Sequence, residues 1–184
     1  MDNGASSYRR FLDGDDNGFI EIIKDYKDGL ILYINNFTRN IFTAEDLAED
    51  TFVKIVTRKP RFSGKSSFKT WLYAIGRNVA LDYLRRHSVV EVSTDELQQI
   101  REEEESLEAQ YIKKEDNIQL HKAIRNLIPQ YRQVIWLVYF EDFSNIEVAA
   151  VMKKSVRSVE TLLYRAKQSL KTELNKEGFE YEKL

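Results

Sequence analysis

The stretch FSGKSSFKTWLYAIGRNVALDYLRR, residues 62–86, starts with small polar residues and continues with a helical pattern. Apolar residues recur along it at spacings of three and four: Phe68, Leu72, Ile75 and Val79. This periodicity predicts a helix with one buried face. Either Ser66 or Ser67 can begin that helix, because a serine hydroxyl accepts a hydrogen bond from a backbone N–H of the first turn.

Aromatic and basic side chains are interleaved along the same stretch. The rings and cations beyond its first residue are Phe68, Trp71, Tyr73, Tyr83, Lys65, Lys69, Arg77, Arg85 and Arg86. Proteins hold single-stranded nucleic acid with rings that stack on bases and with cations that follow the phosphates. Packing in a core is the other use of a ring. It suits Phe68 better, while both uses stay open for Trp71 and Tyr73. On the more polar face, Asn78 beside Arg77 can read an adenine edge or bond to a neighbouring carbonyl.

Length and composition restrict the class of protein. The 184 residues fit one ordinary domain or two small ones. The absence of cysteine excludes disulfide bonds and thiolate zinc sites. No apolar run approaches the roughly 18 residues that a membrane span needs, and the N-terminus has no hydrophobic signal region. We therefore expect a cytoplasmic protein without direct membrane insertion.

Charge is distributed unevenly, although the formal net charge is only −2. Basic residues dominate 61–86 and 152–172, whereas acidic residues dominate 13–50 and 91–116. A local basic surface attracts nucleic acid even when the total charge is close to zero. The near-neutral total therefore hides two basic segments that are separated by an acidic one.

Spacings of three and four dominate the chain and strict alternation is absent, which predicts an all-α fold. We expect two small helical domains, residues 1–87 and 116–184, joined by a flexible acidic linker, residues 88–115. A solvated helical face is an equal alternative for that linker. In the first domain, Thr43 can cap a helix over residues 44–57.

The last part of the chain has helix-turn-helix form. Ser144 or Asn145 can cap a short first helix, and Ser155 can cap a longer second one. Helical hairpins of this form are common, so DNA binding and simple packing both stay open. If the hairpin binds DNA, residues at the start of the second helix would meet base edges in a major groove: Arg157, Ser158, Glu160 and Thr161. Basic residues nearby would reach phosphates: Lys153, Lys154, Arg165 and Lys167. We expect Ile146, Ala149, Ala150 and Met152 of the first helix to pack against the second.

Enzyme chemistry has little support in the sequence. The histidines, His87 and His121, lie in different segments, and a Gly-rich phosphate loop is absent. His121 fits the surface or the core edge of a domain better than a catalytic site. We predict no catalytic residue, no cofactor and no metal site.

The helix over residues 44–57 has an acidic outer face formed by Glu45, Asp46, Glu49 and Asp50. Such a face is usually solvated. Its other use is to dock on a basic or coiled-coil partner.

Three stretches together resemble one family, the bacterial RNA polymerase sigma factors of the small extracytoplasmic-function type in the sigma-70 superfamily. They are TAEDLAEDTFVKI (43–55), the stretch 62–86, and LIPQYRQVIWLVYFEDFSNIEVAAVMKKSVRSVETLLYRAKQSL (127–170). They are similar to the family's core-binding helix, minus-ten segment and helix-turn-helix, in that order. The resemblance implies a subunit that binds core RNA polymerase, directs it to promoter DNA and helps to open the duplex.

The resemblance also implies three binding surfaces and one further partner, an anti-sigma factor. The core polymerase-binding surface would meet the clamp coiled coil of the largest subunit: Asp46, Leu47, Glu49, Asp50 and Phe52. The minus-ten surface would cup one flipped base and follow the melted strand: Phe62, Ser63, Gly64, Lys65, Ser66, Ser67, Trp71, Arg77, Asn78, Asp82, Arg85 and Arg86. The minus-thirty-five surface would read duplex DNA: Lys153, Lys154, Ser155, Arg157, Ser158, Glu160, Thr161 and Arg165.

This chain departs from the family pattern at several positions. Glu160 and Leu162 stand where Lys or Arg is usual. Residues 152–155, MKKS, replace a turn that usually contains glycine. Gly76 stands where alanine is usual, and a glycine inside a helix costs up to about 1 kcal/mol relative to alanine.

Two other classes of protein stay open as alternatives. A helix-turn-helix regulator would bind duplex DNA tightly without polymerase, whereas a sigma factor of this type should bind poorly until core polymerase orders its two domains. A helical-bundle enzyme with carboxylate metal ligands would gain thermal stability from metal.

Overall fold

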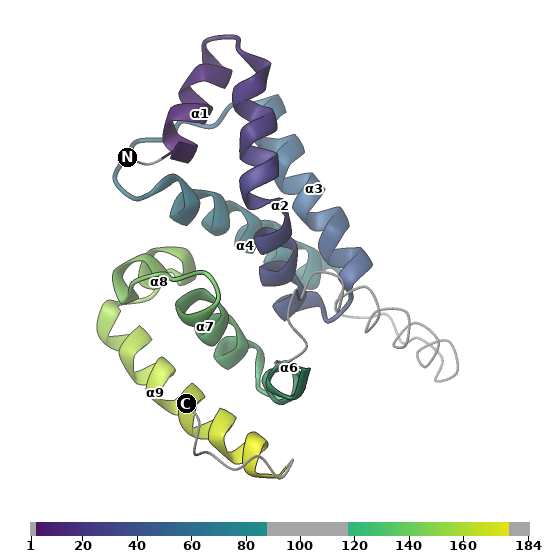
Figure 1. The fold of residues 1–184 in the computed structure, drawn as a ribbon, viewed down its shortest axis with the longest axis vertical. Helices are drawn as coiled ribbons and strands as arrows, with labels where there is room; N and C mark the ends of the chain where they lie inside the picture. Colours follow the sequence, from purple (N-terminus) through teal and green to yellow (C-terminus); the bar gives the residue numbers. More distant parts are fainter. Residues whose placement is uncertain (1–2, 88–117, 177–184) are drawn as a thin grey trace.

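The computed structural model describes residues 3–87 and 118–176, and all regular structure in these residues is helical (Figure 1). The helices group into two domains, one formed by the helices that precede residue 88 in the sequence and one by those that follow residue 117 (Figure 1). The predicted all-α, two-domain fold is confirmed. The predicted linker, residues 88–115, lies outside the described residues.

The helices of the first domain are α1 (Asn3–Leu12), α2 (Asp16–Thr38), α3 (Ile41–Arg58) and α4 (Phe68–His87). Both α1 and α3 pack on α2, and α4 contacts α2 and α3 as it runs across them (Figure 1). A Cβ on Gly76 would lie 2.8 Å from Leu30 Cδ1. Glycine therefore lets α4 approach α2 closely, which gives a physical reason for its presence where alanine is usual.

The boundary between α2 and α3 differs from the sequence prediction. Arg39 ends α2 in the left-handed conformation, with a φ of 53°. The Asn40 side chain then accepts a hydrogen bond of 2.7 Å from the Thr43 N–H. The prediction that Thr43 caps the helix is wrong, because Asn40 is the capping residue and the helix begins at Ile41.

The second domain consists of α6 (Ile118–Arg125), α7 (Pro129–Tyr139), α8 (Asn145–Met152) and α9 (Val156–Lys176). Ser144 and Glu147 form a capping box at the start of α8. The Ser155 hydroxyl accepts a hydrogen bond of 3.2 Å from the Ser158 N–H and so caps α9, as the sequence predicts. Lys153, between the two helices, has a φ of 54°. It therefore holds the left-handed conformation that glycine holds most easily.

The buried face of α8 is only partly the one predicted. Ile146 is 71% exposed, and Ala150 is exposed as well. Ala149 and Met152 are buried as predicted, and Val148 and Val151 are buried with them. Val148, Val151 and Met152 have the spacing of three and four that places residues on one helical face. The expectation for Ile146 and Ala150 was wrong because both lie on the opposite side of α8 from Val148, Val151 and Met152.

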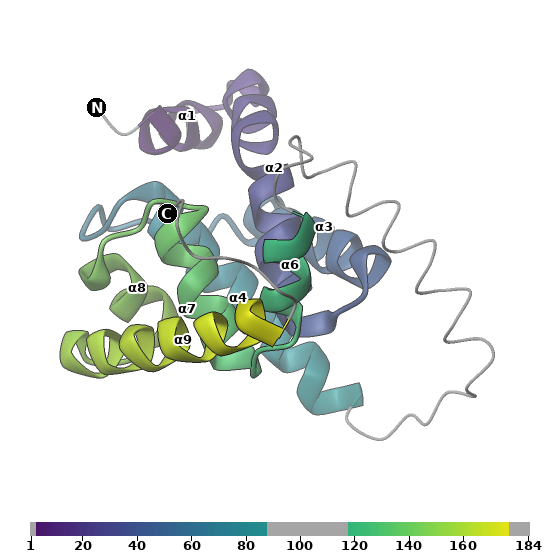
Figure 2. The ribbon, with the colours of Figure 1, turned by 60° about the horizontal axis from the view of Figure 1, so that its bottom comes forward.

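The two domains pack on each other. α4 lies against α8, and α2 lies against α7 (Figures 1 and 2). Neither contact follows from the helical periodicity, which predicts two separate domains. The packing places the start of α4, with the loop before it, next to the helix-turn-helix of α8 and α9.

Candidate nucleic-acid interface

The loop before α4 is an exposed polar turn with one apolar anchor. Gly64 has a φ of 70° with open space around it, and Ser63 and Lys65 are exposed. Phe62 is half-buried, and its ring packs on the Phe68 ring with 5.7 Å between centroids. The Ser67 hydroxyl accepts a hydrogen bond of 3.2 Å from the Thr70 N–H, which makes Ser67 rather than Ser66 the cap of α4.

Trp71 belongs to an aromatic cluster and is also partly exposed. Its ring centroid lies 5.2 Å from that of Tyr8, 5.4 Å from that of Phe62 and 5.3 Å from that of Phe68. Phe68 is fully buried, as the preferred interpretation of that ring predicts. Tyr73 is also buried. Of the two rings for which stacking on a base stayed open, Trp71 and Tyr73, only Trp71 therefore keeps an exposed part that a base could reach.

The remaining predicted minus-ten residues lie along α4. Arg77 and Asn78 are half-buried, and the Arg77 Nε is buried without a hydrogen-bond partner among the described residues. Near the end of the helix, Arg85 forms an ion pair of 3.0 Å with Asp82. Arg86 is exposed, and its Nε donates to the Asp82 carbonyl. Asp82 therefore orients cations on this surface and does not itself attract a DNA strand.

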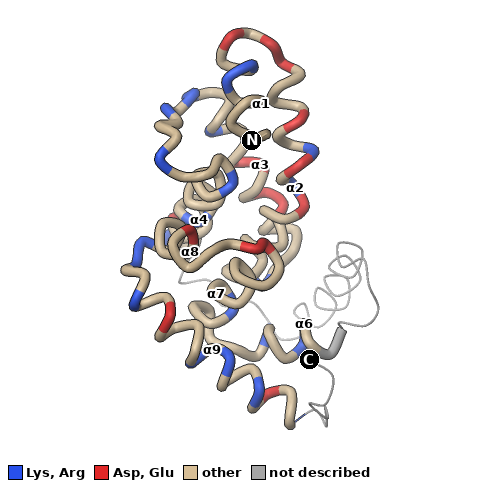
Figure 3. Tube along the Cα trace, turned by 60° about the vertical axis from the view of Figure 1, so that its left-hand side comes forward, with Lys and Arg blue, Asp and Glu red and all other residues tan. Residues whose placement is uncertain are grey.

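The start of α9 presents an exposed surface for duplex DNA. The predicted residues on it, Arg157, Ser158, Glu160, Thr161 and Arg165, are all exposed. In the turn before it, Lys153 and Ser155 are exposed and Lys154 is half-buried. Figure 3 shows blue lysine and arginine positions along the length of α9.

Tyr164 is a residue of this surface that the sequence analysis missed. It is 66% exposed on α9. It follows Arg157 by seven positions and Thr161 by three, so it lies on the same helical face. That spacing was available in the sequence as a signal. An exposed tyrosine there adds apolar contact surface of the kind that meets a thymine methyl group.

The acidic face of α3 is only partly the one predicted. Asp46, Glu49 and Asp50 are exposed, but Leu47 and Phe52 are 5% and 6% exposed and belong to the core. The two apolar residues can therefore position α3 but offer little surface to a partner. Three other apolar residues of α3 are exposed and were missed: Phe42, Val53 and Val56.

Glu141 is the centre of the contact between the domains. Its Oε2 lies 2.8 Å from Lys69 Nζ of α4, and its backbone carbonyl accepts from the same ammonium group at 2.8 Å. Within its own domain, its Oε1 accepts from Trp136 Nε1 at 3.2 Å. Burial, and next the Glu141 carboxylate, raise the pKa of the Tyr73 hydroxyl well above its usual value, so Tyr73 stays a donor.

Glu147 is a second carboxylate at the same contact. Its Oε1 accepts hydrogen bonds from the Ser67 hydroxyl at 3.1 Å and the Thr70 hydroxyl at 3.2 Å. Its other oxygen, Oε2, completes the capping box with Ser144. Burial alone would raise the pKa of the Glu147 carboxyl, but the hydrogen bonds that it accepts outweigh burial and lower that pKa.

Arg132 joins the domains at the far end of α2. The Asn36 carbonyl of α2 accepts from its Nε at 3.0 Å and from its Nη2 at 2.8 Å. Its Nη1 donates to the Leu127 carbonyl at 2.6 Å. Carbonyls at helix C-termini carry partial negative charge, which suits a buried guanidinium. Burial, followed by the charges of Arg39 and Arg125, lowers the pKa of Arg132 to about 10, which leaves it charged at neutral pH.

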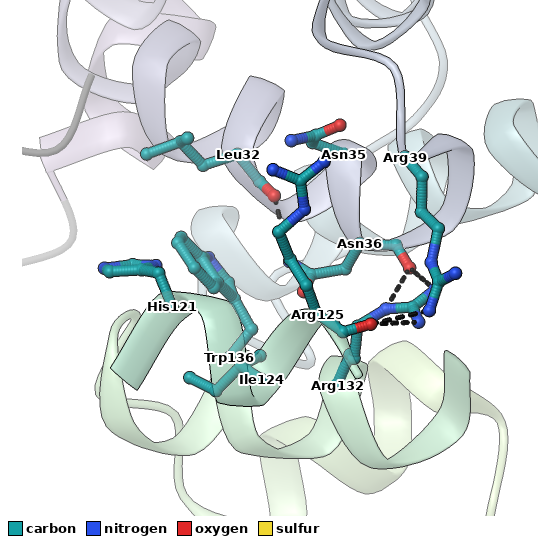
Figure 4. A pocket seen from close by; sticks show the side chains of 9 residues that line it. All are labelled: Leu32, Asn35, Asn36, Arg39, His121, Ile124, Arg125, Arg132 and Trp136. Atoms are coloured by element: carbon teal, nitrogen blue, oxygen red, sulfur yellow. Dashed lines mark hydrogen bonds between the residues drawn. The ribbon is translucent and has the colours of Figure 1, made fainter. Parts of the chain in front are cut away.

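A small pocket lies beside Arg132 between the two domains (Figure 4). Its lining comes from α2 on one side and from α6 and α7 on the other: Leu32, Asn35, Asn36, Arg39, His121, Ile124, Arg125, Arg132 and Trp136. His121 is buried, and its ring packs on those of Trp136 and Phe140. Burial lowers the pKa of His121, so the imidazole is neutral at neutral pH.

Two kinds of site are not found in residues 3–87 and 118–176. No group of three or more His, Cys, Asp or Glu side chains there is arranged to hold a metal ion. None of the helices in this part of the chain is both long enough and apolar enough to cross a membrane.

Comparison with known proteins finds matches for both domains. Residues 22–89 match the family model for Sigma-70 region 2, and residues 117–170 match that for Sigma-70, region 4. Over 161 residues the chain is 30% identical to RNA polymerase sigma factor YlaC of Bacillus subtilis, with 85% of this chain and 91% of YlaC covered. Over 170 residues it is 28% identical to ECF RNA polymerase sigma factor SigW of the same organism, with 88% and 91% covered.

A solved structure shares the fold. It is the complex of the sigma factor RpoE with the anti-sigma factor NepR from Bartonella quintana. The match has a TM-score of 0.65 at 19% identity and covers 85% of this chain and 96% of that one. At this identity the likeness concerns the arrangement of helices.

Proposed function

Because the chain belongs to the extracytoplasmic-function sigma factors of the sigma-70 family, we propose which of its surfaces serve which step of promoter recognition. The resemblance drawn from three stretches of sequence is confirmed. Sigma factors carry promoter specificity for RNA polymerase and are not enzymes. The first domain, residues 1–87, is proposed as region two, and residues 116–184 as region four.

The proposed polymerase-binding surface is the exposed face of α3. It combines the carboxylates of Asp46, Glu49 and Asp50 with the exposed apolar side chains of Val53 and Val56. An apolar centre with charges around it is the usual composition of a protein interface. The proposed partner is the clamp coiled coil of the largest polymerase subunit.

The proposed minus-ten surface is the loop 62–67 with the outer side of α4. The loop offers hydroxyls and backbone groups around Gly64, where a flipped base would be bound. Trp71 would stack at the edge of the melted segment, since part of its ring is exposed. Arg77, Arg85 and Lys65 would follow the strand's phosphates.

The proposed minus-thirty-five surface is the start of α9, where Arg157, Glu160, Thr161 and Tyr164 are exposed together. Glu160 can accept a hydrogen bond from a cytosine amino group in the major groove. It also lowers the local positive charge, so this surface depends more on base contacts than on phosphate contacts.

The observation that carries the proposal is the order of three surfaces along one chain: an acidic docking helix, a loop with a ring and cations, and a helix-turn-helix. We further propose a cytoplasmic protein whose partners are core polymerase, promoter DNA and an anti-sigma factor. The anti-sigma factor is included because the RpoE chain of similar fold is bound to one in its solved structure. A regulator that works without polymerase is the competing proposal.

Promoter binding with and without core polymerase tests this proposal. In a gel shift with duplex promoter DNA, the chain alone should bind weakly, and the chain with core polymerase should bind tightly and specifically. Tight specific binding by the chain alone, with no gain from core polymerase, would favour the regulator instead.

A further inference from the structure

A charged groove runs between the C-terminal halves of α3 and α4, which pack on each other (Figure 1). Its volume is about 400 Å³, within the range of pockets that hold ligands. On each helix the lining residues recur at spacings of three and four, so each helix contributes one face. The lining residues are Asp50, Val53, Lys54, Thr57, Arg58, Val79, Asp82 and Arg86.

Three cations of this groove have no anionic partner in the described part of the chain. Lys54 and Arg58 lie four residues apart on α3, and Arg86 lines the groove from α4. None of the three forms an ion pair with a carboxylate of residues 3–87 or 118–176. Arg86 donates from its Nε to the Asp82 carbonyl at 3.2 Å, and its Nη groups donate to no residue in these ranges.

The two carboxylates of the lining do not cancel these cations. Asp82 is paired with Arg85, which lies outside the groove, at 3.0 Å. Asp50 is exposed and belongs to the acidic face of α3. The groove therefore has an excess of positive charge, which attracts an anion.

We propose that this groove holds the backbone of the duplex upstream of the minus-ten element, with Lys54, Arg58 and Arg86 bound to its phosphates. The proposal rests on the proposed function, since it takes loop 62–67 and Trp71 as the place where the melted strand begins. It gives α3 a second role beside polymerase docking. Lys54 and Arg58 belong to none of the three binding surfaces that the sequence predicts.

A DNA backbone matches the chemistry of the groove. Phosphate oxygens accept hydrogen bonds from ammonium and guanidinium groups, and such contacts position a protein on DNA without reading its sequence. The same lining includes Val53, which is 57% exposed, and the half-buried Val79. These apolar side chains suit the carbon atoms of a sugar that lies between two phosphates.

Helix ends explain only part of this charge. Cations in the last turn of a helix stabilise the helix, because the terminal carbonyls carry partial negative charge. Arg58 and Arg86 lie in the last turns of α3 and α4. Lys54 lies a turn earlier, where that effect has faded. Its place in the groove is therefore not explained by the helix end.

The position of the groove fits double-stranded DNA. Arg86 follows Trp71 by 15 positions on α4. At about 1.5 Å per residue, this is roughly 22 Å along the helix axis. A DNA strand that runs along α4 covers that length in about six to seven base pairs, at roughly 3.4 Å each. If the strand melts at Trp71, the groove meets DNA that is still paired.

The groove adjoins the proposed polymerase-binding surface without coinciding with it. Asp50 and Val53 belong to both, whereas Lys54, Arg58 and Arg86 belong to the groove alone. Polymerase that docks on the acidic face of α3 would therefore hold the groove at a fixed position beside the DNA.

The test compares two double variants of the full chain that remove equal charge. Lys54→Gln with Arg58→Gln removes the two cations that α3 gives to the groove. Arg9→Gln with Lys24→Gln is the matched control, at exposed positions of α1 and α2. The probe is a fluorescent forked DNA, a duplex that continues into a single strand. It is bound by the chain alone and by the chain with core polymerase.

The first readout is the salt dependence of binding to this probe. A plot of log affinity against log salt concentration should have a slope smaller by about 1.8 in the groove variant, since each lost phosphate contact removes about 0.9. The control should keep the slope of the parent. At about 0.1 M salt, the groove variant should bind roughly tenfold more weakly. Equal slopes of the two variants in both arms would overturn the proposal.

Thermal unfolding of the same variants tests the other use of the cations. The groove variant should unfold at the temperature of the control. A loss of stability with an unchanged salt slope would assign Lys54 and Arg58 to the helix end and overturn the proposal.

Affinity for core polymerase separates this proposal from the proposed function. The groove variant should bind core polymerase as tightly as the control does. Weaker polymerase binding with an unchanged salt slope would place the groove in the polymerase interface and overturn the proposal. If the parent itself does not bind core polymerase, the proposed function fails, and the arm with the chain alone still tests the groove.

Discussion

Lys69 of α4 and Glu141, 72 positions later, form an ion pair of 2.8 Å across the two domains. The Glu141 side chain is 9% exposed, so the pair is largely shielded from water on its acidic side. A shielded pair of this kind fixes geometry more than it adds stability, because both charges lose hydration when they meet. It therefore sets how region four sits on region two.

Charge reversal on α3 should weaken polymerase binding. We expect Glu49→Lys with Asp50→Lys to weaken the complex with core polymerase by tenfold or more, since like charges would face a basic partner surface. Both side chains are exposed, so folding should be unaffected. Asp25→Lys, at an exposed position of α2, is the control. Co-purification with core polymerase measures the effect, and equal recovery of both variants would exclude this face as the docking site.

Trp71 should matter for promoter opening beyond its packing. Trp71→Ala should cost about 2 kcal/mol of stability, less than the 3–5 kcal/mol typical of a fully buried tryptophan, and should slow open-complex formation about tenfold. Phe68→Leu, at a fully buried ring of the same cluster, is the comparison and should lower stability alone. Fluorescence of a base analogue near minus ten reports opening. If the rate of open-complex formation falls in both variants only in proportion to their loss of stability, Trp71 acts only through its packing in the core.

His121 should make stability fall as the pH falls. Its pKa is lowered by burial, so between about pH 6.5 and its folded pKa the unfolded chain binds a proton that the folded chain does not. Stability from this group is therefore complete above about pH 6.5 and decreases below it. Arg39, Arg125 and Arg132 line the same pocket.

Urea denaturation at about pH 7.5 and about pH 5.5 measures this dependence. His121→Phe should reduce the difference between the two pH values, whereas His87→Gln, at an exposed position, should leave it unchanged. The same difference in all three proteins would assign the dependence to other groups.

Replacing Lys153 with glycine should make the protein more stable. Its φ of 54° places an L side chain in the left-handed region, where glycine is free of the Cβ contact. We expect Lys153→Gly to raise the free energy of unfolding by about 0.5–1 kcal/mol. Lys154→Gly, next to it and without positive φ, should lower stability. The midpoint of urea denaturation shows whether each variant is more or less stable than the parent. A loss of stability in both variants would contradict the strain assigned to Lys153.

Sequence periodicity predicted the helices well where strong local signals fix their ends. Ser67 and Ser155 cap α4 and α9, because each signal acts within one turn. Asn40 was missed as a cap because Thr43 offered the same chemistry three residues later. Which of two such residues caps depends on where α2 ends, and α2 ends at a left-handed arginine that no residue pattern predicts.

The binding surfaces were predicted less completely than the helices. A family motif does not separate residues that hold a helix in place from residues that face a partner, so Leu47 and Phe52 were assigned to the polymerase-binding surface although both are buried. The contact between the domains was not predicted at all. It depends on Glu141 and Glu147 meeting residues more than 70 positions earlier, and charge alone does not identify such pairs.

Run-off transcription from a randomised promoter library tests the central claim most directly. Purified chain is added to core RNA polymerase, and transcripts are sequenced to recover the templates used. A promoter-specificity subunit should select templates that share one minus-ten and one minus-thirty-five element, and core polymerase alone should select none. Transcripts from the same unselected templates with and without the chain would contradict the claim.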